Sequence, residues 1–286
     1  MKISVPKINI PGPVRLFIKL AILAAIIFLI VRKIDEKLLL TVISQANPFW
    51  VFVAIVLFAL SKLVSAFRFN TFLKTENIHL PTWDNVRLYW LCMYYNLLLP
   101  GGISGDAYKI KVLMERFGNS FKRLLTLTLM DRVSGLIALL QIALGLFTAL
   151  ILPSYWFVAL MLLIMSFVAS WYVFRRIIGP KMQEWMYTSL YSWVVQGSQC
   201  LSVLALCVSF GLWVQAPDYI LLFLISSVVS MLPITIGGAG AREITFLFGA
   251  QYLSIQEENA VAFAFLIYLI STGISFLGIV FSFSKK

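Results

Sequence analysis

Charged residues are scarce in this 286-residue sequence. Only 12% of the residues are charged and 61% are hydrophobic, whereas soluble domains are about 25% charged and about 45–50% apolar. This composition excludes a soluble fold and a disordered chain. A transmembrane helix needs about 20 apolar residues, so the length allows roughly six to nine crossings. We expect an all-α polytopic membrane protein built as a helical bundle.

Histidine and cysteine are also rare. Cys92, Cys200 and Cys207 lie in apolar segments, which is typical of small core residues rather than of a disulfide framework. The single histidine, His79, stands in a polar loop beside Pro81 with no second ligand nearby. We therefore expect no metal and no cofactor.

Catalytic motifs are missing as well. The sequence has no Gly-x-Ser-x-Gly, no His-Glu-x-x-His and no Walker loop, and its loops are too short for a soluble catalytic domain. We expect no catalytic residues and no enzyme activity. The net charge of +11 indicates cytoplasmic loops that face an anionic leaflet. It does not indicate a nucleic-acid partner, because zinc-finger spacing and an aromatic-basic face are both lacking.

Apolar runs of spanning length are abundant. The first is followed by the charged stretch 32–37 and not by a small-residue cleavage site, so we expect a retained helix rather than a signal peptide. Arg68 is expected in the polar loop after the second run, and Lys62 is expected to snorkel to the cytoplasmic end of that run. The expected full spans are 14–31, 48–67, 124–152, 154–174, 187–213 and 259–283.

Two other apolar stretches are interrupted. The run 88–99 stops at Pro100, where Gly101, Gly102 and Gly105 follow, and a new helix is expected over 106–117. The run 219–232 stops at Pro233, the break holds Gly237, Gly238 and Gly240, and an apolar run continues to Tyr252. Such backbone survives at membrane depth when it is buried in protein or lines a wet cavity. Both segments therefore read as re-entrant hairpins, and eight full crossings are the alternative.

The order of spans and hairpins repeats with opposite direction. With the N-terminus in the cytoplasm, the predicted inner stretches hold 16 of the 23 lysines and arginines, and the outer stretches hold three, all within 32–47. We expect one transmembrane domain over 1–286 with inverted halves of about 14–152 and 154–283. Interrupted helices at matching places in such halves point to a substrate site near the midplane.

Five ionisable residues fall within or beside the apolar core: Asp106, Asp131, Arg132, Arg242 and Glu243. Left unpaired, they would together cost on the order of 12–18 kcal/mol. They must pair with one another, face water or meet a charged ligand. The sequence leaves two hypotheses open, structural ion pairs and direct contact of an arginine with substrate.

The glycine-rich turns add anion-binding capacity, because a helix N-terminus presents free N–H groups. Ser104 to Asp106 and Gly238 to Gly240 each open a half-helix. A lipid phosphate could bind there with Arg132 or Arg242. The simpler interpretation is that Ser104 and Asp106 only cap a helix.

Three segments together carry a resemblance to a known family: 96–109 (NLLLPGGISGDAYK), 131–136 (DRVSGL) and 232–243 (LPITIGGAGARE). Over about 15–283, the chain resembles the lysylphosphatidylglycerol synthase transmembrane, flippase-like family. The resemblance implies lipid or polyprenyl-glycolipid movement, with the recurring charged positions at the five residues named above. Related multiple-peptide-resistance proteins add a cytosolic aminoacyl-transfer domain. The 286 residues contain none, so we expect no lysine transfer.

The combined prediction is a translocator for a phospholipid or a polyprenyl-linked glycolipid, with membrane lipids as partners. The head group is expected between the two hairpins at a site formed by the five charged residues and by Gly101, Gly102, Gly105, Gly237, Gly238 and Gly240. The alternatives are a membrane enzyme and a partner subunit of envelope-biosynthesis proteins. The expected location is the plasma (inner) membrane.

Overall fold

The computed structural model describes residues 46–98, 104–231 and 241–282. The expected first span and the two Pro/Gly breaks lie outside these ranges. The chain divides into two compact units, 1–45 and 46–286, and every feature below belongs to the second. Its described α-helices are α3 (Pro48–Lys74), α4 (Thr82–Leu98), α5 (Ser104–Phe117), α6 (Phe121–Ile151), α7 (Trp156–Ile177), α8 (Met182–Ser209), α9 (Ala216–Ser230), α10 (Ala241–Leu253) and α11 (Glu257–Phe276). The 3-10 helix η1 (Pro153–Tyr155) connects α6 to α7, and η2 (Trp213–Gln215) connects α8 to α9. A third, η3 (Leu277–Ser282), follows α11.

Six helical stretches of the described chain are long and apolar enough to cross a membrane: Pro48–Lys74, Phe121–Ile151, Pro153–Ile177, Met182–Ser209, Trp213–Ser230 and Asn259–Ser282. This confirms the all-α polytopic membrane fold. The stretch 213–230 qualifies by length although it was expected as one limb of a hairpin. The described parts of α4, α5 and α10 have 17, 14 and 13 residues, fewer than the about 20 of a usual crossing.

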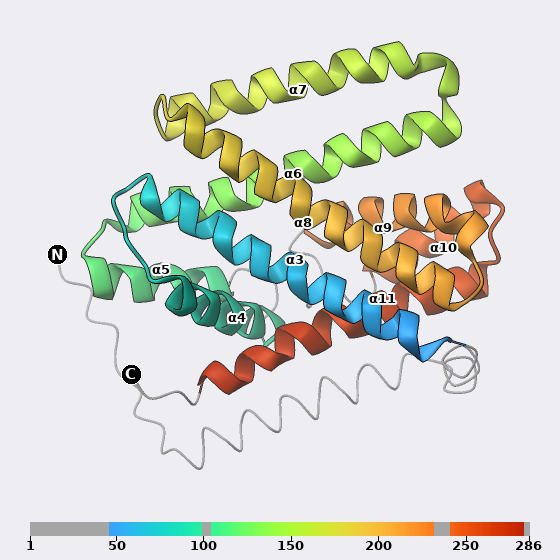
Figure 1. The fold of residues 1–286 in the computed structure, drawn as a ribbon, viewed down its shortest axis with the longest axis horizontal. Helices are drawn as coiled ribbons and strands as arrows, with labels where there is room; N and C mark the ends of the chain where they lie inside the picture. The colour runs from blue at the N-terminus through green and yellow to red at the C-terminus, as the bar shows by residue number, and fades with distance from the viewer. Residues whose placement is uncertain (1–45, 99–103, 232–240, 283–286) are drawn as a thin grey trace. The chain divides into compact units, whose positions relative to one another are not determined.

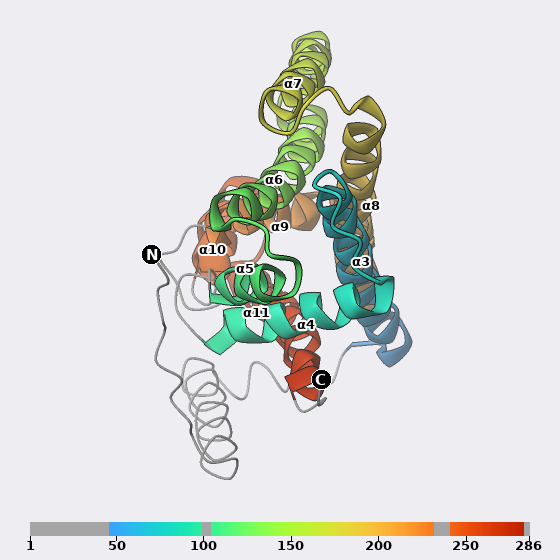
Figure 2. The same cartoon turned by 90° about the vertical axis from the view of Figure 1, so that its left-hand side faces the viewer.

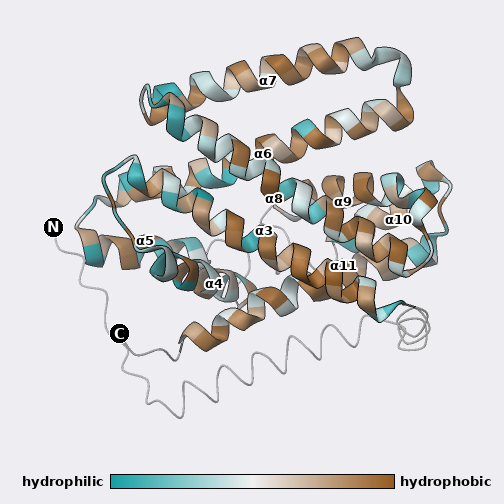
Figure 3. Ribbon diagram, viewed as in Figure 1, coloured by the Kyte–Doolittle hydropathy of each residue, from teal (hydrophilic) through white to brown (hydrophobic). Residues whose placement is uncertain are grey.

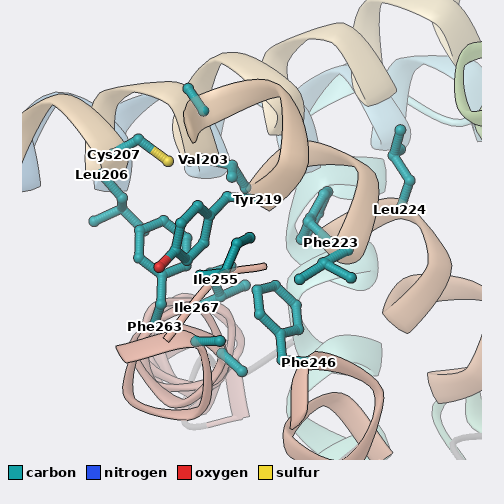
Figure 4. Packing of buried hydrophobic residues seen from close by; sticks show 14 of the residues in the cluster. Val203, Leu206, Cys207, Tyr219, Phe223, Leu224, Phe246, Ile255, Phe263 and Ile267 are labelled. Atoms are coloured by element: carbon teal, nitrogen blue, oxygen red, sulfur yellow. The ribbon is translucent and has the colours of Figure 1, made fainter. Parts of the chain in front are cut away.

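Two apolar clusters hold the helices together. One joins α3, α4, α5, α6 and α7 through buried side chains that include Phe69, Leu113 and Leu127. The other joins α8, α9, α10 and α11 (Figure 4), where the rings of Tyr219 and Phe263 lie 4.6 Å apart, and it also takes in Ala54 of α3 and Leu139 of α6. The helices α3 and α6 therefore contribute to both cores.

The helices α3 and α8 run antiparallel along each other (Figures 1 and 2). The backbone N–H of Asn47, which caps the start of α3, donates to the carbonyl of Ser209 at the end of α8. At the other end, Lys181 before α8 donates to the carbonyl of Thr75 after α3. Small residues permit this close approach, and Ser202 Oγ donates to the carbonyl of Ala54 at 2.7 Å.

The outward faces are strongly apolar (Figure 3), most of all along α7. Large side chains there are more than half exposed, including Trp156, Phe157, Met165, Val168 and Tyr172. Exposure of such a large apolar patch to water would be unfavourable. Its exposure to lipid is not, because acyl chains are as apolar as these side chains.

The second expected span is longer than predicted and changes the place of Arg68. The structure continues α3 to Lys74, beyond the expected end at Phe67, so Arg68 is a buried helical residue and the expectation of a loop position was wrong. Lys109, which was expected in a cytoplasmic stretch over 109–123, is also buried. Both cations contact other groups of the protein, and these contacts compensate the loss of hydration.

Candidate functional site

A cavity of about 510 Å³ lies among the helices of the described chain. Its wall carries side chains from α3, α4, α6, α8, α9, α10 and α11. Among the described wall residues four are cationic, namely Lys62, Arg68, Arg132 and Arg242, and one is acidic, Asp131. A cavity of this charge inside an apolar helical body favours an anionic occupant.

Arg68 is held by a buried ion pair. Its Nε donates to Oδ1 of Asp131 at 2.8 Å, and both side chains are 6% exposed. Its Nη1 also donates to Ser192 Oγ at 3.0 Å. One guanidinium therefore joins α3 to α6 and α8 and satisfies a carboxylate that would otherwise be buried without a counter-charge.

A glycine makes room for this guanidinium. A Cβ atom at Gly135 would lie 2.8 Å from Nη1 of Arg68. The carbonyl of Gly135 accepts a hydrogen bond from Gln196 Nε2 at 3.1 Å. The Asp-Arg-Val-Ser-Gly sequence on α6 thus supplies the carboxylate for Arg68 and, one turn later, the space for it.

Asp106 connects the short helix α5 to α6. Its Oδ2 lies 2.6 Å from Nη2 of Arg132, and its Oδ1 lies 3.7 Å from Nζ of Lys109. The Lys109 ammonium also lies over the rings of Phe69 and Tyr89, at 4.1 and 4.7 Å from their centres. Asp106 thus neutralises Arg132, while Lys109 gains aromatic contacts that compensate its burial.

The start of α5 is closed by side chains of α4 and α5. The N–H of Gly105 donates to Asn96 Oδ1 at 2.7 Å, and Ser104 Oγ donates to the carbonyl of Tyr95 at 2.7 Å. A Cβ at position 105 would lie 2.0 Å from the carbonyl oxygen of Cys92. Gly105 therefore lets α5 approach α4, and its N–H group already has an acceptor within the protein.

Lys62 and Arg242 stand apart from these ion pairs. Lys62 turns into the cavity, with Nζ 4.6 Å from the ring centre of Phe58, rather than snorkelling outward. Arg242 lies 5.2 Å from the ring of Phe223, and its buried Nη1 has no hydrogen-bond partner among the described residues. Neither cation has a carboxylate oxygen within 4.0 Å in the described part of the chain.

The structure brings together only part of the predicted site. Asp131, Arg132 and Arg242 line the cavity, and Asp106 reaches it through Arg132. Glu243 follows Arg242 on α10 and interacts electrostatically with it. Gly101, Gly102, Gly237, Gly238 and Gly240 lie outside the described residues, so their role stays a prediction.

Sequence reasoning missed Lys62 and Arg68. A signal was present, because Lys62, Ser65 and Arg68 recur at intervals of three residues and so share one face of a helix. All three line the cavity. Over the described ranges, no group of His, Cys, Asp and Glu side chains is arranged to hold a metal ion.

Comparison with known proteins gives the family. A family model described as lysylphosphatidylglycerol synthase TM region matches residues 16–278. Searches of curated proteins and of solved structures found no match. With its apolar helices the chain is a multi-pass membrane protein, and the match fits a membrane protein that acts on lipids. The chain belongs to the lysylphosphatidylglycerol synthase TM region family.

Proposed function

We propose that the chain moves a phospholipid or a polyprenyl-linked glycolipid between membrane leaflets, with the head group bound in the cavity and the apolar tails left in lipid. The observation that carries the proposal is that two cations of the described cavity wall, Lys62 and Arg242, have no carboxylate oxygen within 4.0 Å. Burying such charges is costly without an anion. The phosphate of a lipid head group supplies one at membrane depth.

The serines of the wall support a head group that also carries hydroxyls. Ser227, Ser230, Ser271 and Ser275 line the cavity. Each donates its own proton to a carbonyl three or four residues earlier, at 2.7 to 2.9 Å. Their oxygens remain as acceptors. Glycerol and sugar hydroxyls are the matching donors.

The short helices support translocation rather than storage of a lipid. The described parts of α4 and α10 are shorter than a usual crossing, and both helices line the cavity together with the longer α3, α6 and α8. This arrangement is typical of secondary transporters. We place the protein in the plasma (inner) membrane with its N-terminus in the cytoplasm, following the bias of lysine and arginine in the loops.

The test is lipid exchange in vesicles together with mass spectrometry of copurified lipids. Purified protein in vesicles should expose a fluorescent head-group-labelled phosphatidylglycerol of the inner leaflet to an impermeant quencher. One anionic lipid should copurify with the wild type and be depleted from an Arg132→Ala/Arg242→Ala variant that still folds. No exchange of any anionic lipid, with only bulk lipid in both samples, would contradict the proposal.

A further inference from the structure

Part of the cavity wall repeats between the two halves in the same register. On α4, Met93, Asn96 and Leu97 lie 11, 14 and 15 residues after Thr82. At the same distances after Ala216, the first residue of α9, the wall residues are Ser227, Ser230 and Met231.

The longer helices follow the same rule. Lys62 and Ser65 lie 14 and 17 residues after Pro48 on α3, and at those distances after Met182 on α8 the wall residues are Gln196 and Gln199. On α6, Gly135 and Leu139 lie 14 and 18 residues after Phe121, and Ser271 and Ser275 lie equally far after Glu257 on α11. Together with the antiparallel course of α3 and α8, these matching positions favour a pseudo-twofold axis through the cavity.

The charges do not follow this symmetry. Gln196 is the equivalent of Lys62, and α5, the counterpart of α10 in chain order, gives the cavity no described wall residue where α10 gives Arg242. The two halves thus present different cations to one shared space.

The cations of the wall also differ in their neutralisation. Arg68 lies against Asp131, and Arg132 lies against Asp106. Lys62 shares the cavity wall with Arg242 and Arg68, whose positive charges repel it, and no carboxylate oxygen of the described residues lies within 4.0 Å of its Nζ. Glu243 offsets part of the charge of Arg242 but does not line the cavity. An oxyanion between Lys62 and Arg242 would replace this repulsion by two attractions.

We infer that Lys62 and Arg242 form a single oxyanion subsite, which binds a phosphate group at one side of the pseudo-twofold axis, and that Arg68 and Arg132 are structural cations. The inference rests on the proposed head-group cavity and deepens it. A ligand phosphate then has one position rather than two equivalent ones, so the lipid enters the cavity in one orientation.

The experiment exchanges the two symmetry-equivalent residues. Full-length protein in phosphatidylcholine nanodiscs is titrated with sodium phosphate and, separately, with dihexanoyl phosphatidylglycerol, and dihexanoyl phosphatidylcholine is the control ligand. Lys62→Gln should weaken binding of the phosphatidylglycerol by about tenfold or more, the scale of one lost charge-assisted hydrogen bond. Lys62→Arg should bind within a few fold of the wild type.

The decisive variant is Lys62→Gln/Gln196→Lys, which keeps the composition and total charge of the wall. We expect binding to stay lost, because no described residue of α5 lines the cavity to pair with the transplanted lysine as Arg242 of α10 pairs with Lys62. Recovery would overturn the inference and leave total charge as the determinant. If this variant does not fold, Lys122→Gln serves instead, because it removes one exposed cation that does not line the cavity, and loss of binding as large as in Lys62→Gln overturns the inference.

The ligands separate the possible sources of the phosphate. Binding of both phosphate and the phosphatidylglycerol identifies a general oxyanion subsite. Binding of the phosphatidylglycerol alone identifies a head-group subsite. Either result supports the inference if Lys62→Gln weakens the binding. Equal binding by wild type and Lys62→Gln overturns it. Lipid exchange in vesicles is measured separately. If wild type and Lys62→Gln exchange lipid equally well, the subsite is refuted and translocation is not. If binding depends on Lys62 but no lipid is exchanged, translocation is refuted and the subsite is not.

Discussion

Arg68 and Asp131 form a buried ion pair of 2.8 Å between α3 and α6, inside a protein whose outer faces are apolar. Ser192 of α8 accepts a further hydrogen bond from the same guanidinium. The pair therefore holds three helices together at the wall of the cavity. It also explains how two charges are retained in a region where each alone would be costly.

Removal of either partner should destabilise the fold. We expect Arg68→Met or Asp131→Leu to lose about 3–5 kcal/mol, because each leaves an uncompensated buried charge. The double variant Arg68→Met/Asp131→Leu should recover much of that loss. Unfolding in mixed detergent micelles, followed by tryptophan fluorescence, measures these differences. Additive losses in the double variant would contradict the pairing.

Space at Gly135 should be required for the same pair. Gly135→Ala places a Cβ 2.8 Å from Nη1 of Arg68, and we expect a loss of about 1–3 kcal/mol from overpacking. Gly145→Ala is the matched control on α6, because nothing lies within 4 Å of its Cβ. The control should be neutral or gain up to about 1 kcal/mol from helix propensity. Equal effects at the two positions would refute the steric role.

Close approach of α5 to α4 should depend on Gly105. Alanine there would meet the backbone oxygen of Cys92 at 2.0 Å, and a backbone atom cannot move aside as a flexible side chain can. We expect Gly105→Ala to lower the melting temperature and the yield of folded protein, with a cost of at least about 1–3 kcal/mol. Gly273→Ala on α11 has open space and should leave both quantities unchanged.

Coupling between Asp106 and Arg132 should be measurable by a double-mutant cycle with Asp106→Asn and Arg132→Met. Contacting residues couple by about 0.5–3 kcal/mol. Arg132 is 38% exposed, so we expect a value in the lower part of that range. The control cycle uses the exposed pair Asp84 and Arg116, whose charged atoms lie 2.8 Å apart. It should give about 0.2–1 kcal/mol. A coupling near zero for Asp106 and Arg132 would contradict the ion pair.

Orientation in the membrane should follow the loop charges. In a background without Cys92, Cys200 and Cys207, a cysteine replacing Lys122 should be shielded in intact cells from an impermeant maleimide, and one replacing Gln256 should be labelled. Both parent residues are exposed, so access to reagent is decided by the membrane side. The reverse pattern would place the N-terminus outside and refute the predicted topology.

The membrane class and the helical architecture were predictable from local sequence. Runs such as 124–152 are long and apolar, and only a helix satisfies its backbone within lipid. The structure confirms this run as α6 (Phe121–Ile151). The acidic and basic residues of α5, α6 and α10 were recognisable for the same reason, because charge in an apolar run is rare.

The pairing of those charges was not predictable. Arg68 was expected in a loop because sequence around 68–74 becomes polar, but Asp131, 63 positions later in the chain, draws it into the helical body. Lys62 was expected at the membrane surface, since an isolated lysine near a span end usually extends toward water. The cavity that it faces is formed by helices from both halves, and no local pattern encodes such a space.

Local hydrophobicity was enough to predict that this chain crosses a membrane as helices, and its motifs were enough to recognise the family. The breaks at Pro100 and Pro233 stay a prediction, because they lie outside the described residues. Which cations are neutralised, and which face the cavity without a carboxylate, could be read only from the folded chain. A charge in a low-dielectric interior is governed by its neighbours within a few ångströms, and those neighbours come from distant parts of the chain.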